Sequence, residues 1–374
     1  MRIGIEAQRL FRERKHGMEV VALETIRELQ KLTHSHEIVV FVKEDNHVCI
    51  TSNDTMEVVQ LPSSPYPVWE QLSLRKALNK HKVDLIHCTA NTAPLFLKKN
   101  LILTLHDIIY LESVSFSGSA YQNFGNLYRR FIVPKIVDQC SFIITVSNYE
   151  KECISSRLDV NPEKIKVVYN AINPSFKVYE DESLSRIKIK YDLPERFILH
   201  FGNTAQKKNT IGTLKAFAEL KTSEKHKNLY LVITDCKEDY IDNILQGIKS
   251  KNIKPYIKIL DYVPFIEVPF LYNLATVFMY PSLRESFGMP VLEAMACGTP
   301  VVTSNTSSMP EISGEAAVLV NPYDPFEIAS NTDYLLSNSK YYSSKIEEGI
   351  IQSEKFNWTN TAKEILTIYN DISI

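Results

Sequence analysis

Short apolar runs alternate with segments of helical period along residues 1–170. The run "RIGIEA" (2–7) predicts a strand, and 18–32 predicts a helix because its apolar residues recur every three or four positions. Further strand candidates are "EIVVFV" (37–42), "VDLIHC" (83–88), "LILTLHD" (101–107), "SFIITVS" (141–147) and "KIKVVYN" (164–170). Continuous apolar strands between helices are typical of a parallel sheet with helices on both faces.

The same alternation restarts after a charged stretch at 173–196, which Pro174 and Pro194 bracket. The strand candidates of this half are "FILHFGN" (197–203), "NLYLVIT" (228–234), "YIKILDYV" (256–263), "TVFMYPS" (276–282), "TPVVTS" (299–304) and "AAVLVNP" (316–322). Helical segments are expected at 209–221, 266–274 and 289–297. The chain therefore reads as two similar α/β halves joined by one linker.

A chain of 374 residues is longer than one hydrophobic core usually serves. We predict an N-terminal Rossmann-like domain at 1–172, a linker at 173–196 and a C-terminal Rossmann-like domain at 197–354. The amphipathic helix at 355–374 is free to pack back on the N-terminal domain. Two parallel sheets that face each other across a cleft place a ligand site at the carboxyl ends of their strands.

Composition narrows the class of protein. Apolar residues make up 44% of the chain and charged residues 23%, as in ordinary soluble domains, and a net charge of −2 argues against a dedicated nucleic-acid binder. The six cysteines are scattered without a C-x-x-C pair, which favours free thiols in a reducing compartment. No segment looks like a signal peptide or a membrane span. We expect a cytoplasmic protein, with contact to the inner face of the membrane left open.

The most informative stretch is "RESFGMPVLEAMACGTPVV" (284–302), which follows the strand "TVFMYPS". Pro290 suits the first turn of a helix and Gly298 suits its end, so the helix should span about 290–297. Unpaired amides at such an N-terminus attract phosphate. Glu293 would repel that phosphate unless it accepts hydrogen bonds from sugar hydroxyls, and Glu285 is free to meet a second set of hydroxyls. A nucleotide-sugar has this order of groups.

Cations for such a ligand are supplied by "GNTAQKKNT" (202–210), after the first strand of the second half. Lys207 and Lys208 would lie at the carboxyl end of that strand. Taken alone, two lysines before a helix are typical of a solvated turn. Beside the glutamate-containing helix on the same sheet, they favour a diphosphate site.

The sequence resembles the retaining glycosyltransferases of the GT-B fold that use nucleotide-diphosphate sugars. The family pattern E-x-F-G-x-x-x-x-E is matched at 285–293, and "SSMPEISGEAAVLVNPYDP" (307–325) is also similar to family sequence. Further matches are "TLHD" (104–107), "TVSNYEK" (145–151), "KIKVVYN" (164–170) and "GNTAQKKN" (202–209). The likeness covers nearly the whole chain.

The resemblance implies roles for individual residues. Glu293 would hold the ribose hydroxyls of the nucleotide, Glu285 the donor sugar, and His106 would reach over that sugar from the first domain. Lys207 and Lys208 would neutralise the leaving diphosphate. The other implied donor contacts are Gly17, Gly202, Asn203, Tyr262, Val263 and the backbone amides of Phe287, Gly288, Met289, Val291 and Leu292. The chain departs from the family at Glu19, often a second glycine, and at Lys207, usually arginine.

The resemblance implies a metal-independent hexosyltransferase that acts with retention, with a lean toward GDP-mannose as donor and a saccharide or lipid-linked saccharide as acceptor. No cofactor is expected beyond the donor itself, since neither half has a G-x-G-x-x-G fingerprint and no D-x-D motif suggests a metal. A nucleotide-sugar 2-epimerase-like isomerase and a non-catalytic nucleotide-sugar-binding subunit are the alternatives. A glycoside hydrolase is disfavoured because no second acid faces Glu285.

One basic segment remains outside this assignment. In "YRRFIVPKIVD" (128–138), Arg129, Arg130 and Lys135 are interleaved with apolar residues. We interpret them as surface side chains whose stems pack on apolar neighbours. Contact with a membrane that carries a lipid-linked acceptor is the alternative.

Overall fold

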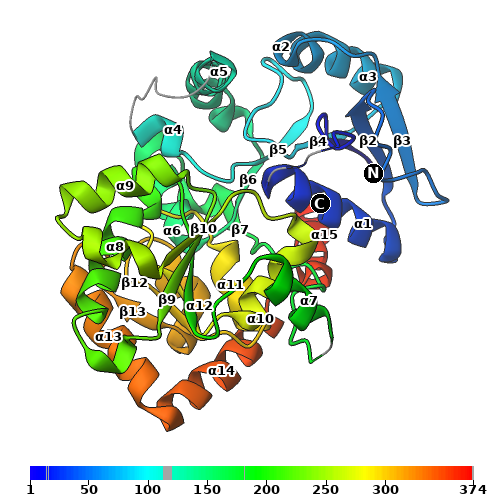
Figure 1. Cartoon of the computed structure of the whole chain (residues 1–374). Coiled ribbons are helices and arrows are strands. Elements are labelled where there is room, and N and C mark those ends of the chain that lie inside the picture. Colours follow the sequence, from blue (N-terminus) through cyan, green and yellow to red (C-terminus); the bar gives the residue numbers. More distant parts are fainter. Residues whose placement is uncertain (14, 16, 113–119, 181, 373–374) are drawn as a thin grey trace. The chain divides into compact units, whose positions relative to one another are not determined.

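The computed structural model describes residues 1–13, 15, 17–112, 120–180 and 182–372 (Figure 1). The chain divides into two compact units. Unit 1 comprises Met1–Ala171 with Asn357–Ile374, and unit 2 comprises Ile172–Phe356. The predicted linker, 173–196, thus belongs to unit 2.

Unit 1 is built on a parallel sheet in the order β3-β2-β1-β4-β5-β6-β7. Its strands are β1 (Arg2–Glu6), β2 (Glu37–Lys43), β3 (Met56–Leu61), β4 (Leu85–Cys88), β5 (Asn100–Thr104), β6 (Phe142–Thr145) and β7 (Ile165–Val167). Its helices are α1 (Gly17–Lys31), α2 (Tyr66–Val68), α3 (Arg75–Lys80), α4 (Ile109–Glu112), α5 (Ala120–Ile136), α6 (Asn148–Leu158) and α15 (Trp358–Ile372). The six strands predicted for this half are confirmed.

The sequence reading missed β3, at the edge of this sheet. It pairs with β2 alone, and only Met56 of its six residues is fully buried. An edge strand covered on one side keeps polar residues, so "MEVVQL" lacks the continuous apolar run of its neighbours.

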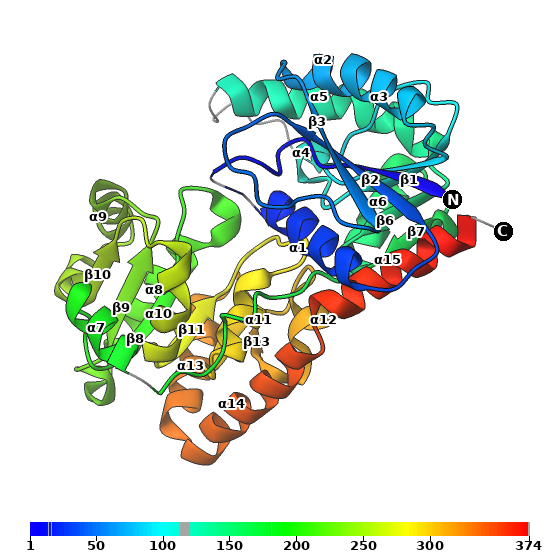
Figure 2. The same cartoon turned by 90° about the vertical axis from the view of Figure 1, so that its right-hand side faces the viewer.

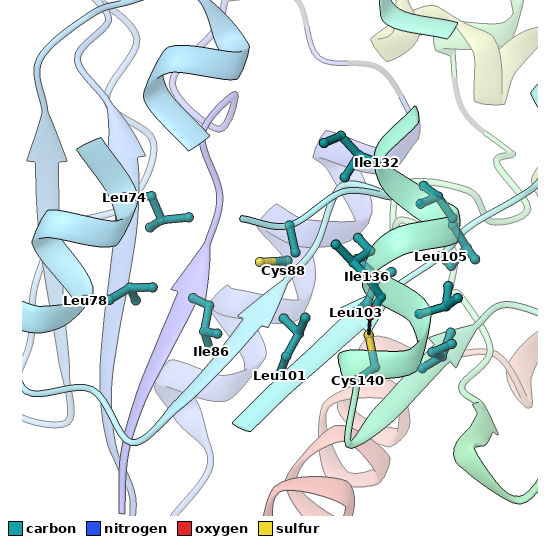
Figure 3. Close-up of a cluster of buried hydrophobic side chains, with 14 of the residues drawn as sticks. Leu74, Leu78, Ile86, Cys88, Leu101, Leu103, Leu105, Ile132, Ile136 and Cys140 are labelled. Atoms are coloured by element: carbon teal, nitrogen blue, oxygen red, sulfur yellow. Dashed lines mark hydrogen bonds between the residues drawn. The ribbon is translucent and has the colours of Figure 1, made fainter. Parts of the chain in front are cut away.

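Two layers of helices cover the sheet of unit 1 (Figures 1 and 2). On one face, side chains from α3 and α5 pack with the strands in a single core cluster, which runs from Leu78 past Ile86 and Leu103 to Ile136 (Figure 3). On the other face, α1 and α15 pack against the strands and against each other. The last helix of the chain therefore completes the first unit.

Unit 2 repeats the design with a parallel sheet in the order β10-β9-β8-β11-β12-β13. The strands are β8 (Phe197–Phe201), β9 (Tyr230–Thr234), β10 (Ile257–Leu260), β11 (Val277–Tyr280), β12 (Val301–Ser304) and β13 (Val318–Val320). The helices are α7 (Glu182–Lys190), α8 (Thr210–Leu220), α9 (Glu238–Gly247), α10 (Val268–Leu274), α11 (Met289–Ala296), α12 (Met309–Ser313), α13 (Pro325–Ser337) and α14 (Ser339–Glu354). All six strands predicted for this half are confirmed.

The segment read as a linker contains α7, which packs against α10. Ile187 of α7 is buried, and the Lys190 ammonium lies 2.7 Å from the Glu267 carboxylate. The sequence did not predict this helix. Its buried face is narrow, with Ile187 as its buried residue, and its other positions are mostly polar, as in a linker.

Candidate functional site

The candidate site of unit 2 lies where the strand order of its sheet reverses direction. β8 has β9 on one side and β11 on the other, with Ile198 paired to Val277. The loops that follow β8 and β11 therefore leave the sheet side by side at its carboxyl edge, the usual ligand position in open α/β sheets. The first loop carries Lys207 and Lys208, and the second carries Glu285.

A hydrogen-bonded network joins these two loops. The Lys208 ammonium lies 2.8 Å from Glu285 Oε1 and also donates to the Tyr280 hydroxyl. Tyr280 in turn donates to Glu285 Oε1 over 2.9 Å. The hydroxyl of Ser282 lies 2.9 Å from the same oxygen and 2.7 Å from the carbonyl oxygen of Lys207. Lys208 and Glu285 are thus held in one geometry before any ligand binds.

The charge state of Glu285 follows from this network. Burial by itself would raise the pKa of the carboxyl, but the Lys208 and Lys207 ammonium groups, with hydrogen bonds from Lys208 and Ser282, hold that pKa below its ordinary value. Glu285 is therefore ionised at neutral pH. Within the described residues its Oε2 receives no hydrogen bond and the Lys207 ammonium has no ion-pair partner.

The helix α11 begins directly after this loop. Gly288, the N-cap residue just before the helix, has φ 103°, and no side chain caps the first turn. A Cβ at Gly288 would lie 2.2 Å from Met309 Cε, so both conformation and space require glycine here. Pro290 lies in the first turn and Gly298 follows the last with φ 71°, which confirms the predicted helix to within one residue. The amide of Val291, a predicted phosphate contact, donates to the carbonyl oxygen of Gly288 over 3.0 Å, and the other amides of this turn lack a side-chain cap, as at helix ends that bind anions.

Glu293 occupies a very different environment one turn into α11. Its side chain is only 8% exposed and accepts a hydrogen bond from the Tyr272 hydroxyl over 3.2 Å. Among the described residues it has no ion-pair partner. Burial raises its pKa to about 7, against the smaller lowering effect of the Tyr272 hydrogen bond. The two glutamates of the motif therefore differ in charge near neutral pH.

This difference predicts a pH-dependent stability. The folded pKa of Glu293 is about 7 and its ordinary value 4.5, so the folded state binds the proton more tightly. The free energy of unfolding should then fall as pH rises from about 4.5 to about 7, by on the order of 3 kcal/mol. Glu293→Gln cannot titrate and should lack this fall. Denaturant unfolding at pH 5 and pH 8 measures it.

Glu6 in unit 1 has a buried carboxyl whose pKa is also raised to about 7, and it titrates in wild type and variant alike. The difference between the two proteins therefore isolates Glu293. If the free energies of unfolding of wild type and Glu293→Gln differ by the same amount at pH 5 and pH 8, the prediction is contradicted.

The other predicted donor contacts of unit 2 have mixed placements. Gly202 is buried, and a Cβ there would lie 2.5 Å from Cys236 Sγ, so packing against β9 accounts for this glycine. Asn203 is exposed, and its side-chain oxygen accepts from the amide of Ala205. Tyr262 is 69% exposed and Val263 buried, in the loop after β10. Among the described residues, no hydrogen bond or ion pair joins Tyr262 or Val263 to the Lys208 network.

Two of the predicted site residues, His106 and Gly17, belong to unit 1. His106 is buried after β5, with Nε2 donating to the carbonyl oxygen of Thr89 over 3.0 Å. Burial lowers its pKa, so the ring is neutral. Gly17 starts α1, where an added Cβ would meet nothing within 4 Å. The carboxylate of Glu19, two residues on, lies 3.7 Å from the guanidinium of Arg9.

Sequence reasoning missed three hydroxyl groups of the site, those of Tyr272, Tyr280 and Ser282. Tyr280 ends β11 on the same face as Phe278, and its ring stacks on Phe278 at 5.4 Å. The ring of Tyr272 meets Phe278 at 5.1 Å, so an aromatic row runs between the partners of the two glutamates. The signal was a tyrosine at the carboxyl end of an apolar strand, where its hydroxyl reaches the edge of the sheet.

The described residues contain neither a cluster of metal ligands nor a membrane-spanning helix. No three His, Cys, Asp or Glu side chains among them gather as metal ligands would. None of the helices formed by these residues has the length and apolarity required to cross a bilayer.

Two family models match the chain. The model of glycosyl transferases group 1 matches residues 181–352, and the model of glycosyltransferase family 4 matches residues 16–176. Together they include the Lys208 network, α11 and His106.

Several relatives are bacterial mannosyltransferases. The chain is 30% identical over 260 residues to the O-antigen chain mannosyltransferase RfbU of Salmonella typhimurium, which is 69% of this chain and 66% of that protein. It is 28% identical over 234 residues to the O-antigen chain mannosyltransferase B of Escherichia coli, 62% of this chain and 61% of that protein. The match to the E. coli serotype-specific mannosyltransferase WbdA covers 29% of its length. The chain thus spans less than two thirds of these relatives.

Solved structures match almost end to end. The Anabaena protein HepE, solved in complex with UDP and glucose, has a TM-score of 0.72 at 17% identity, over 98% of this chain and 99% of that chain. Sucrose-phosphate synthase from Thermosynechococcus elongatus also has a TM-score of 0.72 at 17% identity, over 99% and 98%. At identities this low, the structural similarity shows a common fold and nothing more.

Proposed function

This chain belongs to the glycosyltransferases of the GT-B fold, and on that premise we propose that it transfers a hexose from a nucleotide-diphosphate sugar with retention of configuration. The acceptor is a saccharide or a lipid-linked saccharide, and the reaction takes place in the cytoplasm. The similarity to O-antigen mannosyltransferases supports mannose, with GDP-mannose as the donor. The donor is a co-substrate, and no further cofactor takes part.

One observation carries the proposal: the paired Lys208 and Glu285 stand beside the uncapped N-terminus of α11. Departure of a nucleoside diphosphate leaves negative charge on a phosphate oxygen, and preorganised cations and amides stabilise that charge. We assign this role to Lys207, Lys208 and the first amides of α11. Glu285, ionised and with Oε2 open, accepts hydrogen bonds from the hydroxyls of the donor sugar. Glu293 accepts those of the ribose.

The proposed mechanism uses no protein nucleophile. Glu285 Oε1 is occupied by Lys208, Tyr280 and Ser282, which favours a binding role for this carboxylate. The bond from the anomeric carbon to the leaving phosphate oxygen breaks through an oxocarbenium-like state. That oxygen takes the proton of the acceptor hydroxyl, and the acceptor oxygen bonds to the anomeric carbon on the same face. The role of His106 at the donor sugar stays a prediction; its Nε2 proton is donated to the carbonyl oxygen of Thr89, which leaves Nδ1 as an acceptor.

A donor screen followed by product analysis tests the proposal. Ligands that bind the folded protein raise its unfolding midpoint, so nucleoside diphosphates and their sugars should be ranked by thermal shift. The best donor is then incubated with mannose-containing oligosaccharides, and NMR of the product reports the anomeric configuration. An altered sugar without acceptor would instead identify an isomerase. Intact donor with every acceptor would identify a binding subunit.

We further expect activity to survive chelation. Lysine ammonium groups and helix amides supply the positive charge at the diphosphate in this proposal, so EDTA should leave the initial rate within about twofold of the control. The assay compares EDTA-treated enzyme with the same enzyme after Mg²⁺ is restored. A rate that returns only with Mg²⁺ would refute metal independence while leaving glycosyl transfer intact.

A further inference from the structure

The helix α5 of unit 1 has apolar residues on both of its faces. Ile132, Val133 and Ile136 are buried in the core under the sheet, as Figure 3 shows for Ile132 and Ile136. The opposite stripe, at spacing i, i+3 and i+7, carries large apolar side chains that are 51–58% exposed, namely Phe124, Leu127 and Phe131. A surface helix of a soluble domain normally places polar residues there. The outer stripe therefore needs a separate explanation.

The neighbouring elements extend this apolar stripe. Gln71, in the π-helical turn Trp69–Leu74 after α2, donates to the Tyr128 hydroxyl of α5 over 2.9 Å and accepts from the amide of Leu95 over 2.9 Å. This turn and the 89–99 loop therefore adjoin α5, and Figures 1 and 2 both show α2 and α5 on the same side of the sheet. They add exposed side chains at Val68, Leu72 and Phe96.

These six side chains form what we call the apolar face: Val68, Leu72, Phe96, Phe124, Leu127 and Phe131. Among the described residues of unit 1, seven large apolar side chains are exposed, and only Val48 lies outside this face. Phe96 is 74% exposed and has φ 55°, a conformation that non-glycine residues rarely adopt. Such a concentration marks an interaction surface, since single exposed apolar residues are normally scattered.

The charge around the apolar face is strongly positive. The segments 66–80, 89–99 and 120–136 contain eight lysines and arginines and one carboxylate, Glu70, which is fully buried. The exposed cations include Arg75, Lys76 and Lys98. The Lys135 ammonium lies 3.1 Å from the centroid of the Phe131 ring, so charge and apolar surface adjoin directly.

We propose that the apolar face of unit 1 docks on the surface of an anionic lipid bilayer. Side chains such as Phe and Leu enter the boundary between head groups and acyl chains, while flanking lysines and arginines meet the lipid phosphates. The excess of cations favours an anionic membrane over a second copy of this chain, because two such faces would repel each other. The sequence alone suggested that Arg129 and Arg130 are surface side chains whose stems pack on apolar neighbours. That interpretation does not explain why the phenylalanines of the apolar face are exposed.

This inference does not rest on the proposed reaction, because it concerns binding of the protein to lipid in the absence of donor and acceptor. Its failure would leave the donor assignment standing, and failure of the donor assignment would leave the lipid surface standing.

Vesicle co-sedimentation tests the proposal. The full chain should bind vesicles of phosphatidylcholine mixed with phosphatidylglycerol, and bind phosphatidylcholine alone much more weakly. Replacing Phe124, Leu127 and Phe131 together with serine should lower the partition coefficient by about 100-fold or more, since three apolar side chains no longer insert. Val48→Ser, at an exposed site of the same unit outside the apolar face, is the matched control and should bind as wild type does.

A second variant tests the electrostatic part. Arg75→Glu with Lys76→Glu changes two exposed cations and should weaken binding to the anionic vesicles, and added salt should weaken wild-type binding as well. Unfolding midpoints equal to wild type show that each variant is folded. Equal binding to neutral and anionic vesicles would overturn the proposal. A serine variant that binds vesicles as wild type does would also overturn it. So would a dimer of the wild-type protein, seen in sedimentation, that the serine variant fails to form.

Discussion

Lys208→Ala is expected to lower kcat/KM for glycosyl transfer by on the order of 10²-fold, the usual effect of removing one preorganised charge-stabilising group. In the structure this ammonium is fixed by two partners, Glu285 and Tyr280, and both lie on the loop or strand that borders the first turn of α11. Under the proposed function, a diphosphate would therefore meet a cation already in place. Steady-state kinetics with the donor found by thermal shift measures the loss.

The matched control for this prediction is Lys215→Ala, on the exposed side of α8 a few residues away. It removes the same charge from the same unit without touching the network, so its kcat/KM should stay within about twofold of wild type. Lys208→Arg keeps the charge and should recover part of the activity. A near-normal rate for Lys208→Ala would remove Lys208 from the reaction.

The second large effect is that alanine at Glu293 and alanine at Glu285 should change different properties, the first the affinity for nucleotide and the second the rate of transfer. Glu293→Ala should weaken binding of the free nucleoside diphosphate by about tenfold or more, because a buried acceptor for two ribose hydroxyls is lost. Glu285→Ala should leave that affinity within about threefold, yet lower the transfer rate by on the order of 10²-fold, because its contacts are with the donor sugar. Isothermal titration calorimetry with nucleoside diphosphate, beside initial rates, measures both.

The structure gives a physical reason why the two alanine variants should differ. Glu285 is ionised by the adjacent lysines, whereas Glu293 is buried beside Tyr272 with its pKa raised to about 7. One carboxylate is suited to a site of developing charge and the other to neutral hydroxyl groups. Equal losses of nucleotide affinity in the two alanine variants would contradict the assignment.

The pairing of Lys208 with Glu285 also bears on how the donor enters. Lys208 and Glu285 pair with each other, so Lys207 is the cation of this loop without an ion-pair partner among the described residues. We expect the phosphate to engage Lys207 and the α11 amides while Lys208 keeps its contact with Glu285. The sugar and the phosphate are then held by one connected set of groups.

Several features of this protein follow from the sequence alone. Apolar runs separated by helical segments determined twelve of the strands and the parallel α/β class, because local periodicity reports which residues face a core. Gly288 and Pro290 determined where α11 begins, since one needs a positive φ and the other suits a helical first turn. The motif at 285–293 pointed to glycosyltransferases, and it lies within residues 181–352, which the model of glycosyl transferases group 1 matches.

Tertiary structure decided what local pattern does not record. Lys208 and Glu285 are 77 residues apart in the chain, and only the pairing of β8 with β11 brings them to one edge of the sheet. Tyr280 joined the site for the same reason.

Burial was likewise a property of the folded chain. The raised pKa of Glu293 comes from neighbours on other elements, chiefly their exclusion of water. The outward stripe of α5 could be recognised only once Ile132 and Ile136 were seen to occupy the core, because an apolar helix does not by itself reveal which of its faces meets solvent.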